Sequence, residues 1–210
     1  MPLLSTDTLR TDYLPGVSSG DTETIAVLGR ALSRAEAAVA RYLGYPGHVP
    51  TLASQSYTLR LAAREYDAEV LTVPVVPVTA IASVHQDLLR VFGADSAVSA
   101  SDYEQENLRN GTLLRLLPSG NFSRWYTRER TIKVVCTAGY ANEAAAPPEL
   151  ADAIYRWVAD WYLRREIRHL RSVAASAGAI NQGIADMEAI PPDIEQLISP
   201  YMLLGSVGAT

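Results

Sequence analysis

The hydrophobic periodicity of this chain changes from helical to alternating near residue 54 and returns to helical after residue 147. Between residues 21 and 43, apolar side chains recur at spacings of three, four and seven, the pattern of one buried helix face. From Ser54, apolar Tyr57, Leu59 and Leu61 alternate with more polar neighbours, the pattern of a half-buried strand. A second helical stripe runs from Leu150 through Trp157 and Trp161. This order predicts an α+β fold.

The pattern predicts two principal helices around a β-rich middle, followed by a C-terminal arm. We assign residues 1–175 to a core, with helices at about 21–43 and 148–172 and the β-rich insertion at about 54–140. Within the insertion, Asn110-Gly111 is a tight-turn motif, and residues 86–130 are expected to be built from hairpins. Residues 176–210 are expected to form a flexible arm that docks on a partner.

Composition limits the classes of protein to which the chain can belong. With 210 residues, of which 48% are hydrophobic and 20% charged, it can bury one sizeable core. No apolar run approaches the about 18 residues of a membrane-spanning helix, and the N-terminus does not have the pattern of a secretory signal peptide. We therefore expect no membrane association and an intracellular origin. The net charge of −5 gives no global attraction for nucleic acid.

The C-terminal third combines a basic helix end with a tail that carries no positive charge. No Lys or Arg follows Arg171, and the tail ends in apolar residues. A packed domain with a loose apolar tip indicates a protein that binds another protein. The basic helix end suits the negative end of the helix dipole, or an ion-pair surface between subunits, better than DNA binding, because no basic stripe extends beyond it. The inter-subunit or ion-pair candidates are Arg164, Arg165, Arg168 and Arg171.

No pattern of residues indicates catalysis, so we predict no catalytic residue, no cofactor and no metal site. The single cysteine, Cys136, lies in an alternating strand and is expected to be buried, where a thiol behaves as a small hydrophobe. His48, His85 and His169 lack the spacings of metal-binding motifs.

Several short motifs, taken in order, resemble a known family. An Ala-rich helix ends in Tyr42-Leu43-Gly44, and Pro77-Val78-Thr79-Ala80-Ile81 follows. Asp102-Tyr103 comes next, then a strand-to-helix junction from Thr137 to Ile154, and finally Ile190-Pro191-Pro192-Asp193-Ile194. Over about residues 20–204 the chain resembles the head–tail connector proteins (adaptor or head-completion proteins) of tailed bacteriophages and related gene-transfer particles.

This resemblance implies an α+β fold made of a small helical bundle with a β-rich hairpin insertion and an extended C-terminal arm. It also implies a structural protein of the virion neck, made in the host cytoplasm during assembly. Such proteins form a ring, usually of twelve copies, between the portal protein and the stopper or tail-completion protein. The ring extends the channel for genome retention and ejection, and double-stranded DNA passes through it without sequence-specific binding. By the same resemblance, the C-terminal segment would dock on the portal through Ile190, Pro191, Pro192, Ile194, Leu197, Tyr201, Met202, Leu203 and Leu204.

Residues 86–130 are longer than in compact connectors. We expect them to face the stopper or tail, with Trp125 and Tyr126 as exposed contact residues. Two alternatives to the connector hypothesis stay open at this stage. One is an oligomeric scaffold or regulatory module unrelated to virions, and the other is a small enzyme with an unrecognised site.

Overall fold

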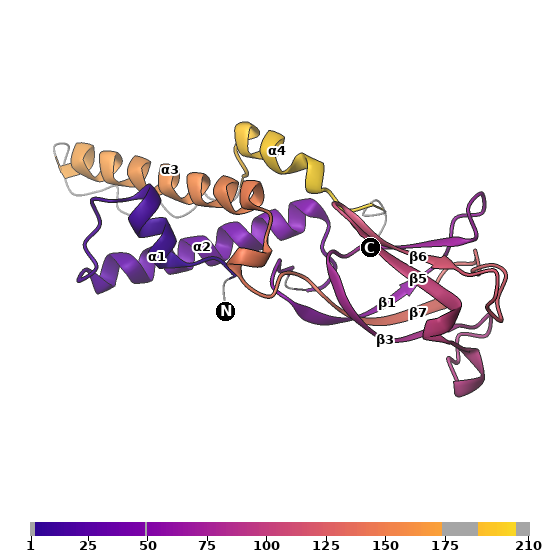
Figure 1. Ribbon diagram of the computed structural model, residues 1–210. Coiled ribbons are helices and arrows are strands. Elements are labelled where there is room, and N and C mark those ends of the chain that lie inside the picture. Colours follow the sequence, from indigo (N-terminus) through magenta and orange to yellow (C-terminus); the bar gives the residue numbers. More distant parts are fainter. Residues whose placement is uncertain (1–2, 49, 174–188, 205–210) are drawn as a thin grey trace. The chain divides into compact units, whose positions relative to one another are not determined.

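The computed structural model describes residues 3–48, 50–173 and 189–204, without the side chains of residues 166–173. The chain divides into two compact units (Figure 1). The helical unit contains residues 3–43, 47–53 and 141–200 as far as they are described. The β unit contains residues 44–46, 54–140 and 201–204. The α+β prediction is confirmed.

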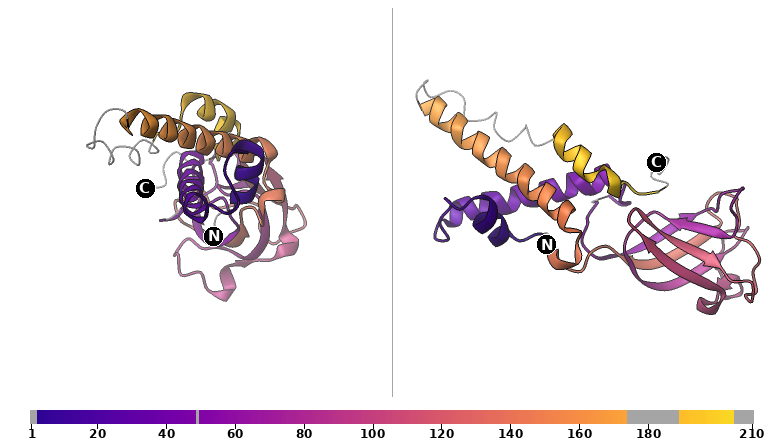
Figure 2. Two further views of the ribbon diagram at one scale, coloured as in Figure 1. Left: turned by 90° about the vertical axis from the view of Figure 1, so that its left-hand side faces the viewer. Right: turned by 45° about the horizontal axis from the view of Figure 1, so that its top comes forward.

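The helical unit is built around α2 (Thr22–Leu43) and α3 (Pro148–Val173), which pack against each other (Figure 2). The Asp21 carboxylate caps α2 by accepting the Thr24 N–H at 3.0 Å. The helix ends before Gly44, whose φ of 88° lies in the left-handed region that favours glycine. The observed ends of both helices agree with the predicted ranges. The buried face of α2 carries Leu28, Ala31, Leu32, Ala35, Glu36, Val39, Ala40 and Leu43.

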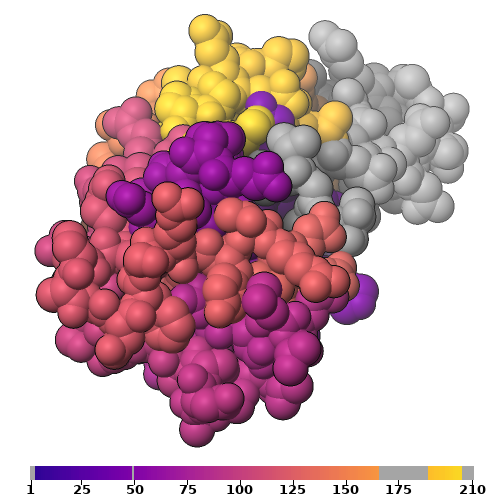
Figure 3. All heavy atoms as spheres, turned by 90° about the vertical axis from the view of Figure 1, so that its right-hand side faces the viewer, coloured from indigo at the N-terminus to yellow at the C-terminus, as the bar shows by residue number. Residues whose placement is uncertain are grey.

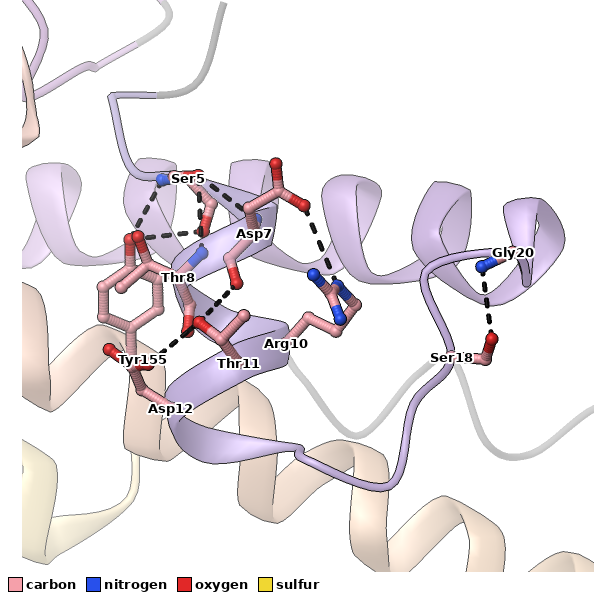
Figure 4. A network of polar contacts seen from close by, with 9 residues as sticks. All are labelled: Ser5, Asp7, Thr8, Arg10, Thr11, Asp12, Ser18, Gly20 and Tyr155. Atoms are coloured by element: carbon pink, nitrogen blue, oxygen red, sulfur yellow. Dashed lines mark hydrogen bonds and ion pairs between the residues drawn. The ribbon is translucent and has the colours of Figure 1, made fainter.

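The N-terminus forms two short helical turns that the sequence patterns do not predict. Ser5 caps α1 (Thr6–Thr8) by accepting the backbone N–H groups of Asp7 and Thr8, and a π-helical turn, η1 (Leu9–Tyr13), follows. Figure 4 shows the polar contacts of this segment, in which the Ser5 N–H donates to the Tyr155 hydroxyl at 2.9 Å. Tyr155 in turn donates to Glu143 at 2.7 Å. The N-terminal segment is thus anchored to the helical unit.

A buried carboxylate strengthens this anchor. Glu36 is only 5% exposed, and its two oxygens accept the backbone N–H groups of Leu3 and Leu4 at 3.0 and 2.7 Å. Burial raises the pKa of the Glu36 carboxyl, and the two N–H donors act in the opposite direction. Leu9, in the same N-terminal segment, is completely buried.

The β unit contains two antiparallel sheets (Figure 2). The first has the order β1-β7-β3-β4 and the second the order β2-β6-β5. The strands are β1 (Gln55–Leu61), β2 (Val70–Val73), β3 (Val78–Gln86), β4 (Ala97–Val98), β5 (Tyr103–Leu108), β6 (Gly111–Leu116) and β7 (Ile132–Ala138). Short 3₁₀ turns occur at Ala94–Ser96 (η2), Ala100–Asp102 (η3), Glu143–Ala145 (η4) and Ser199–Tyr201 (η6).

The core of the β unit is shared by both sheets. In β7 the side chains of Ile132, Val134 and Cys136 alternate with half-buried neighbours and point into this core. Leu71 and Leu114, cross-strand partners in the second sheet, are completely buried in the same cluster. Because β2 pairs with β6, residues before position 86 complete the sheet that contains the predicted Asn110-Gly111 hairpin. Residues 86–130 are therefore part of the β unit's own structure.

The C-terminal arm contains a helix, although an extended segment was predicted from the sequence. Residues 176–188 lie outside the described residues. After them, α4 (Pro192–Ile198) begins with Pro192 in its first turn and packs against α3. Ile194 and Ile198, four residues apart, form its buried face.

Candidate docking surfaces

The predicted portal-docking residues divide into a buried and an exposed group. Ile194, Tyr201 and Leu203 are only 3%, 6% and 3% exposed, because they pack within this chain. Tyr201 and Leu203 therefore serve this chain's own packing in the described structure, and portal docking through the C-terminal residues stays a prediction. Leu197 and Met202 are 43% and 41% exposed. Of the others, Pro192 is exposed, and Ile190, Pro191 and Leu204 are partly exposed.

Residues 201–204 are attached to the turn between β5 and β6. The Leu204 N–H donates to the carbonyl oxygen of Asn110 at 2.7 Å. The guanidinium carbon of Arg109 lies 5.2 Å from the centre of the Tyr201 ring, a cation–π contact. Leu204 also packs close to Gly111, since its side chain lies 3.6 Å from where a Cβ atom of residue 111 would stand, an ordinary van der Waals distance. The turn predicted from Asn110-Gly111 thus holds the end of the described chain.

The basic end of α3 makes contacts within its own helix. Arg164 forms an ion pair with Asp160 at 2.8 Å, and the Arg165 guanidinium lies 5.8 Å from the Trp161 ring centre. Both side chains of the ion pair are largely exposed, so it contributes little to stability. The side chains of Arg168 and Arg171 lie outside the described residues. The inter-subunit role of these arginines stays a prediction.

Trp125 is a core residue, so the expectation that it is exposed is wrong. It is 1% exposed, and its indole Nε1–H donates to the carbonyl oxygen of Leu114 at 3.1 Å. Its ring centre lies 6.4 Å from that of Tyr103. Tyr126 is half-buried, and its backbone N–H donates to the Gln86 side chain at 3.3 Å. The segment around Trp125 has no alternating pattern, which is why its inward orientation is not visible in the sequence.

Cys136 is buried, as predicted, with 1% of its surface exposed. Burial raises the pKa of its thiol to about 11, so the nucleophilic thiolate is scarce at neutral pH. Among the described residues, no group of three or more His, Cys, Asp and Glu side chains is placed to hold a metal ion. Within the same part of the chain, no helix has both the length and the apolar character needed to cross a bilayer.

An exposed apolar loop between β3 and β4 is absent from the sequence-derived candidates. Leu88, Leu89 and Val91 are 51%, 83% and 77% exposed. The run Leu88-Leu89-Arg90-Val91-Phe92 directly after a strand resembles a buried segment in composition. Figure 3 shows the face of the β unit that carries its loops, and the magenta segment that includes residues 87–96 projects at the lower edge. We call residues 87–92 the apolar loop.

The fold of the chain occurs in solved particle structures. No protein-family model matches the chain, and no curated protein matches it. A chain in the structure of the virion of a native gene transfer agent particle is 22% identical, with a TM-score of 0.58; the match covers 98% of this chain and 92% of that chain. A chain in the neck of the empty particle, computed with C6 symmetry, is 20% identical, with a TM-score of 0.57 and the same coverage. A chain in the neck of the native particle, computed with C12 symmetry, is 18% identical, with a TM-score of 0.52, covering 97% of this chain and 93% of that chain.

These similarities include both units, because each match covers nearly all of this chain. The sequence resemblance to connector proteins of phages and gene-transfer particles is thereby confirmed at the level of the fold. The chain has the fold of a protein found in the necks of gene transfer agent particles.

Proposed function

We propose that this chain is a structural virion neck protein that assembles into a ring of about twelve copies between the portal and the stopper or tail components. The observation that carries the proposal is the nearly complete fold match to chains of particle necks computed with C6 and C12 symmetry. A shared fold alone does not define a function. The order of short connector-like motifs along the sequence is a second, independent argument for a neck protein.

The ring would extend the channel through which double-stranded DNA leaves the particle. The chain carries a net charge of −5, so its field repels phosphates on average. Tight phosphate contacts would hold the duplex and make its passage salt-dependent. A ring of acidic subunits therefore suits a channel in which DNA slides without sequence-specific binding. The location is the virion neck, after synthesis in the host cytoplasm.

The role is structural rather than catalytic. Cys136, the only thiol, is buried with a raised pKa, and its burial argues against nucleophilic catalysis. The histidine at position 85 contacts the Gly93 carbonyl oxygen and the Ser96 hydroxyl through Nδ1, at 3.2 and 3.3 Å. These contacts hold the loop that follows β3, which is a structural task.

Portal docking would use the exposed apolar residues of the C-terminal segment. Leu197 and Met202 are the large apolar residues of positions 189–204 that are more than two-fifths exposed. Deleting residues 190–210 would also remove Ile194, Ile198, Tyr201 and Leu203 from buried positions. Substitution of the two exposed residues is therefore the cleaner test of docking.

Imaging the purified protein, alone and mixed with the portal protein of the same genome, tests the ring. We expect mass photometry and negative-stain micrographs to show rings, free or stacked on the portal.

The double variant Leu197→Asp, Met202→Asp should lose portal binding, because a carboxylate cannot enter an apolar contact without a large desolvation cost. Leu163→Asp is the matched control, since Leu163 is 51% exposed but lies on α3. A persistent monomer that ignores the portal would overturn the proposal.

A further inference from the structure

The apolar loop has an ordered backbone. The Asp87 carboxylate accepts the N–H groups of Leu89, Val91 and Phe92 at 2.8, 2.8 and 2.9 Å. The Arg90 guanidinium donates to the carbonyl oxygen of Glu129 at 2.8 Å. Together these bonds tie the loop to itself and to the chain that precedes β7.

Two residues of the loop adopt a costly backbone conformation. Arg90 and Phe92 have φ values of 62° and 57°, in the left-handed region that side chains other than glycine rarely adopt. Such strain persists only where surrounding contacts impose it, and it occurs often at functional sites. The result here is that Leu89 and Val91 point into solvent on a preorganised backbone.

Phe92 anchors the loop on one face of the first sheet. It is 8% exposed, and its ring centre lies 5.1 Å from the Arg60 guanidinium carbon and 5.3 Å from the Lys133 ammonium nitrogen. Arg60 and Lys133 are cross-strand partners in β1 and β7 and therefore lie on the same face. The apolar loop thus covers this face at the end of β1.

A pocket of about 140 Å³ lies at the opposite face of the same strand end. It is lined by Leu61, Ala62, Arg64, Thr72, Pro74 and Leu204. Because side chains alternate along a strand, Leu61 points away from the face that carries Arg60. The lining also comes from β2, and β1 and β2 are both edge strands of their sheets. We call this hollow the edge pocket.

The size and lining of the edge pocket match a leucine side chain. A dry cavity of about 150 Å³ lined by apolar side chains accommodates a benzene-sized group. The edge pocket is close to that volume but is partly open to solvent, and four of its six lining residues are apolar. Leu89, by contrast, is 83% exposed on a strained loop, although Phe92 three residues later is anchored on the sheet.

We propose that the apolar loop of one copy inserts Leu89 into the edge pocket of a neighbouring copy. A ring requires a heterologous contact, in which two different patches of each subunit meet. The loop and the pocket lie on opposite faces of one strand end, so a subunit cannot fill its own pocket with its own loop. Preorganisation lowers the entropic cost of the contact. This inference rests on the proposed ring and assigns one of its contacts to named residues.

Cysteine cross-linking between copies tests the contact. One preparation of the full chain carries Leu89→Cys and a second carries Ala62→Cys; the two are mixed and oxidised. A disulfide requires Cα atoms within about 7 Å, so we expect covalent dimers in the mixture, several-fold above either variant alone. Leu89→Cys mixed with Glu106→Cys, at an exposed position of β5, is the control pair. Native Cys136 is buried and should stay unreacted.

A second variant separates this contact from the ring itself. Leu89→Asp should weaken self-association at least about tenfold, which corresponds to about 1.4 kcal/mol, in mass photometry of a concentration series. If the wild type forms rings but the cysteine mixture gives no dimer and Leu89→Asp assembles normally, this contact is wrong and the ring stands. If the mixture cross-links while no ring forms, the contact stands and the ring is wrong. If the wild type stays monomeric and the cysteine mixture does not cross-link, both the ring and the contact are wrong. If Leu89→Asp assembles normally but no longer binds another neck protein, the loop docks on that partner and the proposed contact between copies is wrong.

Discussion

The C-terminal segment 201–204 and the apolar loop 87–92 are two short apolar stretches that differ in burial. Tyr201 and Leu203 are buried in their own chain, and the Leu204 N–H is bonded to Asn110. In the apolar loop, the backbone is bonded but Leu89 and Val91 stay in solvent. Composition alone does not distinguish the two stretches, and only the C-terminal one was predicted to dock on a partner.

The difference lies in where the backbone hydrogen bonds lead. In the C-terminal segment, the N–H of Leu204 pairs with a turn of the β unit, so its neighbours are drawn into contact. In the apolar loop, the Asp87 carboxylate accepts three N–H groups of its own loop, and the side chains of Leu89 and Val91 face outward. An apolar stretch is thus available for docking only if its backbone partners hold it away from its own core.

The largest effect is expected for Tyr201→Ala in the C-terminal segment. Truncating a buried aromatic side chain removes apolar contacts and leaves a cavity, which should lower the free energy of unfolding by about 3 kcal/mol. The matched variant Met202→Ala, at a position 41% exposed, should cost less than about 1 kcal/mol. Urea denaturation followed by circular dichroism measures both. Equal losses for the two variants would show that burial does not distinguish these neighbours.

A smaller, local effect is expected when the carboxylate of Asp87 titrates. The N–H groups of Phe92 and Leu89, followed by that of Val91, lower the pKa of Asp87 below its usual 3.8. Because the pKa in the folded chain is depressed, the loop's order is complete above the unfolded pKa and is lost as pH falls through the folded pKa. The amide proton shifts of Val91 and Phe92 should therefore titrate together, with a midpoint below 3.8.

The variant Asp87→Asn is the control for this titration. Its amide oxygen can still accept an N–H bond but carries no charge, so the acid transition of Val91 and Phe92 should disappear. Amides of β7 report whether the β unit as a whole unfolds at the same pH. A midpoint at or above 3.8 in the wild type would mean that the carboxylate does not hold the loop.

The elements with long periodic patterns could be predicted from the sequence, and the docking residues only in part. The helices at residues 21–43 and 148–172 were predicted closely because a wide apolar stripe and clear end residues define them. The burial of Trp125 was not predicted, since its partners, among them the Leu114 carbonyl that accepts its indole N–H, lie outside any periodic pattern around it. The helix α4 was missed although Ile194 and Ile198 stand four residues apart, because the two prolines before them suggested an extended arm. The outward orientation of Leu89 depends on left-handed residues that no propensity indicates.

The smallest effect is expected for Leu89→Ser measured on the isolated subunit. Leu89 is 83% exposed in the folded subunit, so it buries almost no additional area when the chain folds. The free energy of unfolding should therefore change by less than about 0.5 kcal/mol at concentrations where the protein is monomeric. The same substitution should weaken self-association, because in the proposed contact the apolar surface of Leu89 is buried against another copy. This separation of the two readouts is what distinguishes a docking residue from a core residue. A stability loss above about 1.5 kcal/mol in the monomer would place Leu89 with Tyr201, among side chains that serve their own fold, and would erase the contrast between the two segments.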